Sequence, residues 1–479
     1  MPGQPKALYV LFMTELWERF GYYSLVSVFT LYLIDELKIA EQTAFLIFGA
    51  YTAFIYLTGV AGGFAADKVL GYGQAILLGA AIMCFGYVGL AFGAVSSMYA
   101  ALALLVVGNG FFKPNVSALL GVYYEADDPR RSAGFTLFYM GINVGGLLGS
   151  LLAGLIAQKF GYPVAFAVAG AGKLVSMATF WAGRRGLEAR DFPSPDAMTN
   201  ARGYGLVVLY IVVALAAAVV LLSRPEAAGV ALGIAVGVVF AGYLAIVLRE
   251  PLEIRNRLLV HLALVIAAIA FFAVYQQYAV SVTVFTDKDI DRTIFGWHLP
   301  ASEFTSLNPA FILLFSPLLA LLWPALARRG RGVDDLLKFV LGLAFLGLGY
   351  WLLVAGIVET AGGAKTTLGW IVGFYALFTL GELCLSPVGL ALTTRLAPPH
   401  LAGLVMGVWL MALTVANYGS GLLGQLVVLP KGAAAAAEVA AYREAFLIYG
   451  AIAIATGIVL LLVVPQLRRL IGDAASVDR

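Results

Sequence analysis

Five polar residues occur at helical spacing within an otherwise apolar stretch near the start of the chain. They are Glu15, Glu18, Arg19, Tyr22 and Tyr23. Residues at these offsets fall on one stripe of a helix, so the five side chains are expected to face the same way. A charge inside a membrane costs about 2.5–3.5 kcal/mol on insertion scales, so this stripe must face other protein groups.

Two interpretations of this stripe are open. Arg19 could form a purely structural ion pair with Glu15 or Glu18. One arginine against two glutamates leaves a surplus acid, however, and a buried surplus acid is a group that can carry a proton. We therefore interpret Glu15, Glu18 and Arg19 as a proton-coupling group, with the structural ion pair as the alternative.

A lysine and a glutamate lie inside two later apolar stretches. Lys113 directly precedes Pro114, which removes a backbone hydrogen bond and is expected to open the helix. Glu382 and Ser386 are one helical turn apart, and Pro387 follows them. The lysine and the glutamate could bind the oppositely charged ends of a substrate, or they could form a permanent bridge with each other.

Aromatic and amide side chains occupy further polar positions in both halves of the chain. Each alone is more often a helix-packing residue, but as a set they could line a cavity for a small zwitterion. The set comprises Tyr56, Tyr139, Asn143, Asn308 and Trp409. Lys173 has no acid within one helical turn. We expect its amine to reach the membrane surface or to lie beyond a helix end, and we assign it no function.

The elements that position these residues must be membrane helices. The chain has 479 residues, of which 62% are hydrophobic and 12% are charged, about half the charged fraction of a soluble domain. A net charge of +3 is too small for nucleic-acid binding. Cys84 and Cys384 lie in apolar stretches, and the histidines lack the spacing of a metal or catalytic site. The composition predicts an all-α, polytopic membrane protein.

Fourteen apolar stretches are long enough to be membrane helices, which need about 20 residues each. The first is too long and too charged to be a cleavable signal peptide. The predicted spans are residues 7–34, 43–66, 74–94, 98–122, 132–158, 163–182, 204–222, 228–248, 258–286, 306–327, 336–358, 368–396, 401–429 and 444–466.

The basic residues concentrate in the connections that share a side with the N-terminus. By the positive-inside rule, these connections and both termini are cytoplasmic. The basic residues on this side include Arg130, Arg131, Arg184, Arg185, Arg249, Arg255, Arg257, Arg328, Arg329, Arg331, Arg468 and Arg469.

A basic linker from Arg184 to Arg202 divides the chain. It predicts a six-helix bundle over 1–183, a linker and two-helix insert over 184–257, and a second six-helix bundle over 258–479. The two helices of the insert have no internal charge and look like passive, lipid-facing additions. In the fifth span, Gly141, Gly145 and Gly149 recur every four residues, which is typical of a close-packing helix face.

Six motifs, spread in order along the chain, resemble the proton-dependent oligopeptide transporter (POT/PTR) family of the major facilitator superfamily. They are Glu-x-x-Glu-Arg-Phe-x-Tyr-Tyr at 15–23, Tyr-Leu-x-x-x-x-Gly-Gly-Phe-x-Ala-Asp at 56–67, Phe-Phe-Lys-Pro-Asn at 111–115, Phe-Tyr-Met-Gly-Ile-Asn-x-Gly at 138–145, Leu-Asn-Pro-x-Phe-Ile at 307–312 and Gly-Glu-Leu-x-Leu-Ser-Pro-x-Gly-Leu at 381–390. The fourteen-helix layout and the short connection at 359–367 resemble the bacterial branch.

The resemblance implies the major facilitator fold, with twelve core helices plus the two-helix insert. It also implies a symporter that imports di- and tripeptides with protons by alternating access. Glu15, Glu18 and Arg19 match the family's proton-coupling motif. Lys113 matches the lysine that engages this motif and the peptide carboxylate, and Glu382 matches the acid that faces the peptide amine. The other positions that match the binding cavity are Tyr22, Tyr23, Tyr56, Tyr139, Asn143, Asn308, Ser386 and Trp409.

Four positions depart from the family pattern. Val26 replaces a second arginine of the first helix, and Gln276 replaces a glutamate of the seventh core helix. Phe272 replaces a tryptophan one turn earlier, and Glu303 stands where a tryptophan is common. These departures bear on the substrate range and on one of the family's gating salt bridges.

The resemblance leaves one alternative function, the proton-coupled transport of another small solute such as a nitrate-like anion or a drug. Glu382 at the amine position disfavours an anion. We expect no cofactor other than the coupling proton, no enzymatic activity, no nucleic acid and no obligate protein partner. The expected location is the bacterial inner membrane, with the lipid bilayer as its surroundings.

Overall fold

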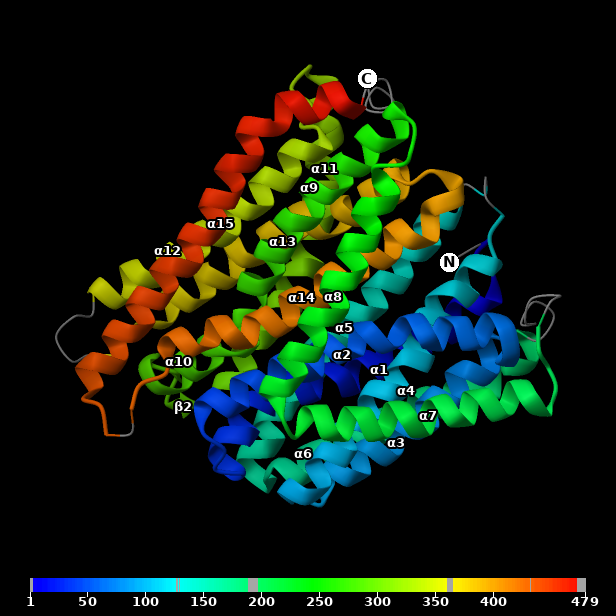
Figure 1. The fold of residues 1–479 in the computed structure, drawn as a ribbon. Helices are drawn as coiled ribbons and strands as arrows, with labels where there is room; N and C mark the ends of the chain where they lie inside the picture. Colours follow the sequence, from blue (N-terminus) through cyan, green and yellow to red (C-terminus); the bar gives the residue numbers. More distant parts are fainter. Residues whose placement is uncertain are drawn as a thin grey trace. The chain divides into compact units, whose positions relative to one another are not determined.

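The computed structural model describes residues 3–125, 128, 130–187, 197–359, 365–430 and 432–471, which are nearly all helical (Figure 1). Within this part of the chain, fourteen α-helices have 20 or more residues, as predicted. They are α1 (Lys6–Leu31), α2 (Glu41–Ala65), α3 (Tyr72–Ala91), α4 (Val95–Val122), α5 (Arg130–Phe160), α6 (Tyr162–Gly183), α7 (Ala201–Leu222), α8 (Pro225–Val247), α9 (Leu252–Tyr275), α11 (Leu307–Arg328), α12 (Asp335–Glu359), α13 (Leu368–Leu396), α14 (Ala402–Gly424) and α15 (Ala435–Ile471).

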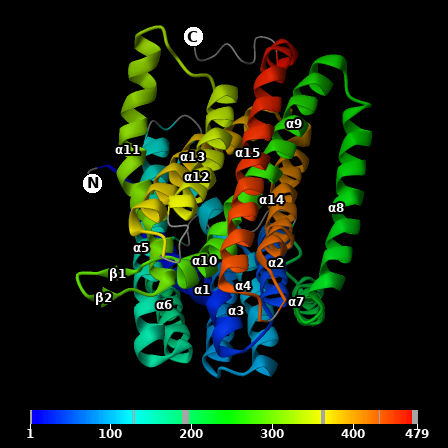
Figure 2. The ribbon, with the colours of Figure 1, turned by 90° about the vertical axis from the view of Figure 1, so that its left-hand side faces the viewer.

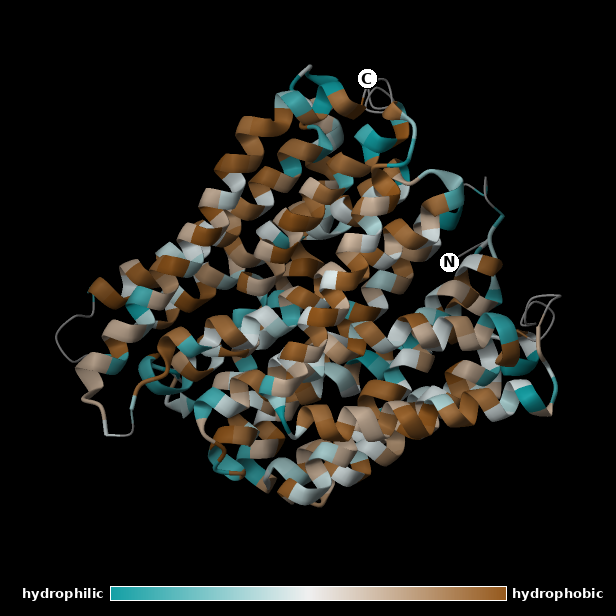
Figure 3. Cartoon of the chain, viewed as in Figure 1, coloured by the Kyte–Doolittle hydropathy of each residue, from teal (hydrophilic) through white to brown (hydrophobic). Residues whose placement is uncertain are grey.

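These long helices have the character of membrane spans. Thirteen of the described helices, together with the short turns that extend some of them, are long and apolar enough to cross a membrane. The remaining long helix, α1, carries Glu15, Glu18 and Arg19. Hydrophobic residues cover most of the helical ribbon, while hydrophilic residues gather at helix ends and connections (Figure 3). The protein is therefore a multi-pass, all-α membrane protein.

Among the described residues, several short elements extend or connect the long helices. Two are π-helical turns at Tyr32–Glu36 and Ala66–Leu70, and five are 3₁₀ turns at Arg184–Gly186, Gln276–Ala279, Ala301–Ser306, Pro399–Leu401 and Gln425–Val427. The others are the short helix α10 (Ser281–Asp289) and the antiparallel strands β1 (Thr293–Ile294) and β2 (Trp297–His298). The hairpin of β1 and β2 projects away from the end of α10 (Figure 2).

Two local predictions differ from the structure. The span predicted over 258–286 is not one helix: α9 ends at Tyr275, and α10 begins after a 3₁₀ turn and the non-helical residue Val280. The helix around Pro114 was expected to open, yet α4 runs through this residue. Asn115, next in the chain, donates from Nδ2 to the Phe111 carbonyl at 2.7 Å and so adds a side-chain bond to this region of the helix.

The chain forms two compact units. Unit 1 comprises Met1–Ala228 and Leu299–Pro309, and unit 2 comprises Gly229–His298 and Ala310–Arg479. In unit 1, α1 packs against α5 and α6, and α3 packs against α4 and α6. The segment Leu299–Pro309 groups with unit 1 because its 3₁₀ turn packs on α5. In unit 2, α12 packs against α13 and α15, and α9 packs against α14 and α15.

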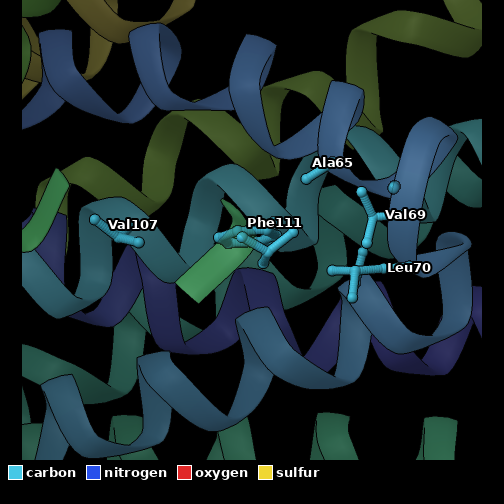
Figure 4. Close-up of a cluster of buried hydrophobic side chains, with 8 residues drawn as sticks. Ala65, Val69, Leu70, Val107 and Phe111 are labelled. Carbon is cyan, nitrogen blue, oxygen red and sulfur yellow. The ribbon is translucent and has the colours of Figure 1, made fainter. Parts of the chain in front are cut away.

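Helix α7 of the predicted insert has one packed face and one exposed face. Its Val207 belongs to a cluster of buried apolar side chains with Phe111 of α4 and residues at the end of α2, part of which is labelled in Figure 4. The Tyr210 ring meets the Phe111 ring edge-on, with centroids 5.8 Å apart. Val208 and Val212 are exposed, as expected for a side that faces lipid. Helix α7 is thus anchored to unit 1.

Candidate functional site

The charged residues of α1 form a buried ion-pair group. Arg19 Nε lies 3.2 Å from Glu15 Oε1 and also pairs with Glu18 Oε2. All three residues are buried. The structure therefore brings Glu15, Glu18 and Arg19 together as the sequence predicts.

This ion-pair group is only partly satisfied. The second carboxylate oxygen of each acid, Glu15 Oε2 and Glu18 Oε1, has no hydrogen-bond partner among the described residues. The same is true of Arg19 Nη2 within this part of the chain. A buried charge needs partners for all its polar atoms to be stable, so the group has unused capacity for a proton or another polar ligand.

The glycine face of α5 determines how closely α1 approaches. A Cβ at Gly141 would meet the Phe12 ring, and one at Gly145 would meet the carbonyl oxygen of Leu16. Gly149 is likewise in contact with α1, and its carbonyl accepts a hydrogen bond from Ser24 at 3.2 Å. The predicted close-packing face is confirmed, because only hydrogen atoms fit between the two backbones here.

Aromatic rings surround the charged group in unit 1. The Arg19 guanidinium lies 4.8 Å from the centroid of the Tyr22 ring. Tyr22 and Tyr23 meet edge-to-face with centroids 5.3 Å apart. A Cβ at Gly146 of α5 would lie 3.1 Å from the Tyr23 ring. The polar side chains of α1 therefore form a chain of contacts from Glu15 through Arg19 and Tyr22 to Tyr23.

Lys113 and Tyr56 are also neighbours within unit 1. The Lys113 Nζ lies 4.8 Å from the centroid of the Tyr56 ring, which is a cation–π distance. Two predicted binding residues, one from α2 and one from α4, therefore lie side by side in unit 1.

The remaining predicted residues of unit 1 lie on α5 and at the start of α11. Asn143 is buried and donates from Nδ2 to the Tyr139 carbonyl at 2.9 Å. The Tyr139 side chain is 43% exposed, which leaves its ring accessible. Asn308 is buried in the first turn of α11.

In unit 2, Glu382 is held by an aromatic residue of a neighbouring helix. The Tyr275 hydroxyl donates to Glu382 Oε2 at 2.9 Å. The Tyr275 ring stacks on Phe378 of α13 with centroids 4.2 Å apart. Because ring stacking orients the tyrosine and its hydroxyl orients the acid, the carboxylate is fixed on α13.

Ser386 and Trp409 complete the predicted residues of unit 2. Ser386 is partly buried one turn after Glu382 on α13, and Trp409 of α14 is buried. A Cβ at Gly389 would collide with the Trp409 ring, so this indole packs directly on the α13 backbone. Glu382, Ser386 and Trp409 thus lie along one stretch of α13 and its contact with α14.

The four departures from the family pattern are accommodated locally. Val26 of α1 is buried, and Gln276 donates from Nε2 to Asn417 Oδ1 in unit 2. Phe272 packs edge-on against the Tyr275 ring. Glu303 is buried, and its Oε1 accepts a hydrogen bond from the Leu155 backbone N–H at 2.9 Å. Because Val26 and Gln276 are neutral, neither position holds a buried charge.

The prediction for Lys173 is wrong. Lys173 was expected to reach the membrane surface or to lie beyond a helix end, but it lies inside α6 and is 0% exposed. Tyr275, the hydrogen-bond partner of Glu382, was not among the predicted residues. Tyr275 directly precedes Gln276, and this position alone is a weak signal for a partner of Glu382. For Lys173, the neighbouring small residues Gly170 and Gly172 could have indicated a closely packed helix face and therefore a buried charge.

Comparison with known proteins identifies the family. The model of the POT family matches residues 73–440. The chain belongs to the POT family.

Curated relatives of this POT-family chain are transporters. It is 34% identical over 422 residues to the "Uncharacterized transporter YclF" of Bacillus subtilis, covering 85% of each chain. It is 31% identical over 480 residues to "Dipeptide and tripeptide permease A" of Escherichia coli, covering 99% of this chain and 95% of the relative.

Solved structures of the family have the same fold. The crystal structure of a peptide transporter POT in complex with sulfate matches with a TM-score of 0.87 and 31% identity, over 98% of this chain and 96% of that one. A mutant of a peptide transporter POT in complex with alafosfalin matches with a TM-score of 0.87 and 32% identity, over the same shares. The major facilitator fold implied by the motifs is therefore confirmed.

Proposed function

We propose that this POT-family protein is a proton-coupled symporter that imports di- and tripeptides by alternating access. The observation that carries the proposal is the partly satisfied group of Glu15, Glu18 and Arg19 in a chain whose relatives include dipeptide and tripeptide permeases. A passive carrier needs no buried acid, whereas proton coupling needs an acid that can gain and lose a proton inside the membrane.

The roles of the other residues follow from the charges of the substrate. A peptide is a zwitterion, and Lys113 in unit 1 carries the charge that its carboxylate needs. Glu382 in unit 2, oriented by Tyr275, carries the charge that its amine needs. Tyr22, Tyr23, Tyr56, Tyr139, Asn143, Asn308, Ser386 and Trp409 supply the aromatic and polar lining.

The sequence and the fold support a bacterial inner-membrane location with both termini in the cytoplasm. The positive-inside distribution of arginines is the basis of this orientation. We propose that the proton is the only coupling partner, that no cofactor and no obligate protein partner takes part, and that the protein is not an enzyme.

Purified protein in liposomes provides the direct test. With an inside-alkaline pH gradient, radiolabelled di-alanine should accumulate, and a protonophore should abolish the accumulation. Glu253→Gln is a matched control for glutamate-to-glutamine variants of the site, because Glu253 is an exposed acid paired with Arg257 at the start of α9. Accumulation of nitrate or of a cationic drug without competition from dipeptides would instead support the alternative function.

A further inference from the structure

The hairpin of β1 and β2 ends in exposed aromatic side chains. Phe295 at its tip is 100% exposed, and Trp297 is 77% exposed. Ile294 pairs with Trp297 across the two strands, so these two side chains lie on the same face of the hairpin. Residues 293–298 include no acid, lysine or arginine. An exposed apolar surface of this kind is typical of a site that contacts another apolar surface.

The backbone of the turn does not favour a phenylalanine. Phe295 and Gly296 connect the two strands, and their φ angles are 49° and 81°. Positive φ at both central residues is typical of a type I′ turn, which favours Asn-Gly or Asp-Gly. A bulky side chain in this region of φ is strained. Because Phe295 is fully exposed, no packing within the described chain offsets this strain, which suggests that the ring serves a contact outside the chain.

The base of the hairpin is held by hydrogen bonds and an ion pair. The backbone N–H of Thr366 donates to the Asp289 carbonyl at 2.8 Å, and the Thr366 carbonyl accepts from the Asp291 N–H at 2.9 Å. Arg292 is buried and lies 3.0 Å from Asp287 Oδ1. The hairpin therefore combines a fixed base with an exposed aromatic tip.

This base lies where membrane-spanning helices of unit 2 end. The apolar stretch of α9 and α10 ends at Asp289, and α13 begins at Leu368, two residues after Thr366. Trp370, in the first turn of α13, donates its indole N–H to Glu359, the last residue of α12, at 2.8 Å. A tryptophan bonded to a polar group at a helix end is typical of the aromatic belt at a membrane surface. The hairpin therefore starts at the membrane surface, and it extends to the side of α10 (Figure 2).

We propose that the β1–β2 hairpin inserts its tip into the lipid headgroup region at this end of unit 2. Trp297 lies at the level of the headgroups, where its ring contacts lipid and its indole N–H reaches polar groups. Phe295 enters deepest, and the contact with lipid offsets the strain of its backbone. The position of the base at the membrane surface and the uncharged tip favour lipid over a second copy or a soluble protein. The hairpin thereby anchors the end of α10 to the bilayer.

This inference rests on the membrane location and not on the transported substrate, so it can be tested without transport. The full chain is placed, one copy each, in nanodiscs of phosphatidylcholine and phosphatidylglycerol. Trp297→Phe keeps an aromatic ring and removes one of the seven tryptophans, so the emission that this variant loses is that of Trp297. Phosphatidylcholine brominated on its acyl chains near the headgroup quenches tryptophans in lipid, whereas acrylamide quenches tryptophans in water.

The emission of Trp297 should be quenched by the brominated lipid and shielded from acrylamide. Phe295→Asp should reverse both results, because Asp-Gly favours the turn while the new charge is costly to place in lipid. Phe295→Asn also favours the turn but removes only the apolar ring, so the ratio of inserted to exposed hairpin should fall by about tenfold. Phe92→Asp is the matched control, because Phe92 follows α3 and is 75% exposed; it should leave the Trp297 emission unchanged.

Three results would overturn the proposal. The first is a wild-type Trp297 that acrylamide quenches and the brominated lipid does not. The second is a Trp297 shielded from both quenchers, which would indicate a protein contact. The third is a Phe295→Asp variant that keeps the lipid quenching of the wild type. If Phe295→Asp does not fold, the comparison of the wild type with Trp297→Phe still decides between lipid and water.

Discussion

The polar centres of the two units are built differently, although both lie on largely apolar helices. In unit 1, Glu15, Glu18 and Arg19 form a partly satisfied ion-pair group. In unit 2, Glu382 accepts a hydrogen bond from a tyrosine, and neutral amides pair with each other.

This difference suggests that unit 1 provides proton coupling and unit 2 provides substrate recognition. A group of several close charges changes its proton occupancy when any one charge moves, because each titration depends on the others. A single carboxylate fixed by a neutral hydroxyl does not have this property, but it presents a fixed charge to a ligand. We therefore expect coupling mutants in unit 1 and recognition mutants in unit 2.

The largest effect should follow from removing the charge of Lys113. Lys113→Gln keeps a polar side chain but loses the cation that we propose for binding the peptide carboxylate. Truncating one partner of a buried charge pair costs about 2–5 kcal/mol, so peptide uptake should fall by about 100-fold or more. Initial rates in liposomes measure this loss. Uptake near the wild-type level, with equal amounts of inserted protein, would exclude the role.

Removing an acid of the proposed proton-coupling group should separate coupling from transport. Glu15→Gln should lose uptake driven by a pH gradient, because position 15 can no longer gain and lose a proton. The same variant should retain counterflow of labelled peptide against unlabelled peptide, which needs no net proton movement. Counterflow and gradient-driven uptake in one preparation measure both properties. Full gradient-driven uptake in Glu15→Gln would place the proton site elsewhere.

Glu382→Gln should impair substrate recognition, and should therefore reduce counterflow as well as gradient-driven uptake. Peptides with a free amino terminus should lose affinity in both uptake and counterflow, by about tenfold or more, because hydrogen bonds to charged groups contribute about 1.5–3 kcal/mol. N-acetylated peptides, which lack the amine charge, should be affected little. Competition curves with both peptide classes measure the contrast. Equal losses for both classes would favour a structural bridge over amine recognition.

A smaller effect is expected from the hydrogen bond that orients Glu382. Tyr275→Phe keeps the stacked ring and removes only the hydroxyl donor. A neutral hydrogen bond contributes about 0.5–1.5 kcal/mol, so the affinity for dipeptides should fall roughly two- to tenfold. Tyr278→Phe is a matched control, because it removes the hydroxyl of a second tyrosine whose ring lies near Phe378, with centroids 5.6 Å apart. No change in Tyr275→Phe would show that α13 alone orients the carboxylate.

The features that sequence could predict are those within one helix or one repeat. The stripe from Glu15 to Tyr23 follows from helical periodicity, and its ion pairs are confirmed. The spacing of Gly141, Gly145 and Gly149 likewise revealed a close-packing face, although it could not show that α1 is the partner.

The features that sequence could not predict depend on contacts between distant segments. Lys173 has no acid in its own helix, yet it is completely buried in the structure. Tyr275 is 107 residues from Glu382, so no local pattern connects them. The turn at Gln276–Ala279 interrupts an apolar stretch that hydropathy alone represents as one span. Each of these features is decided by tertiary packing.

The smallest effect expected is the coupling between the two neutral departures, Val26 in unit 1 and Gln276 in unit 2. The family pattern has an arginine and a glutamate at these positions, which suggests a deleted salt bridge. Val26→Arg would bury an unpaired charge, and Gln276→Glu would replace the amide that donates to Asn417 with an acceptor. Each single variant should therefore lower the thermal stability.

If the two positions face each other in one state of the transport cycle, the double variant should be more stable than the sum of the single effects by about 1 kcal/mol, within the range of interaction energies for residues in contact. Melting temperatures of all four proteins complete this double-mutant cycle. Strictly additive losses would show that the positions do not meet in any populated state. A favourable coupling would show that the two positions meet in a populated state although neither carries a charge in this chain.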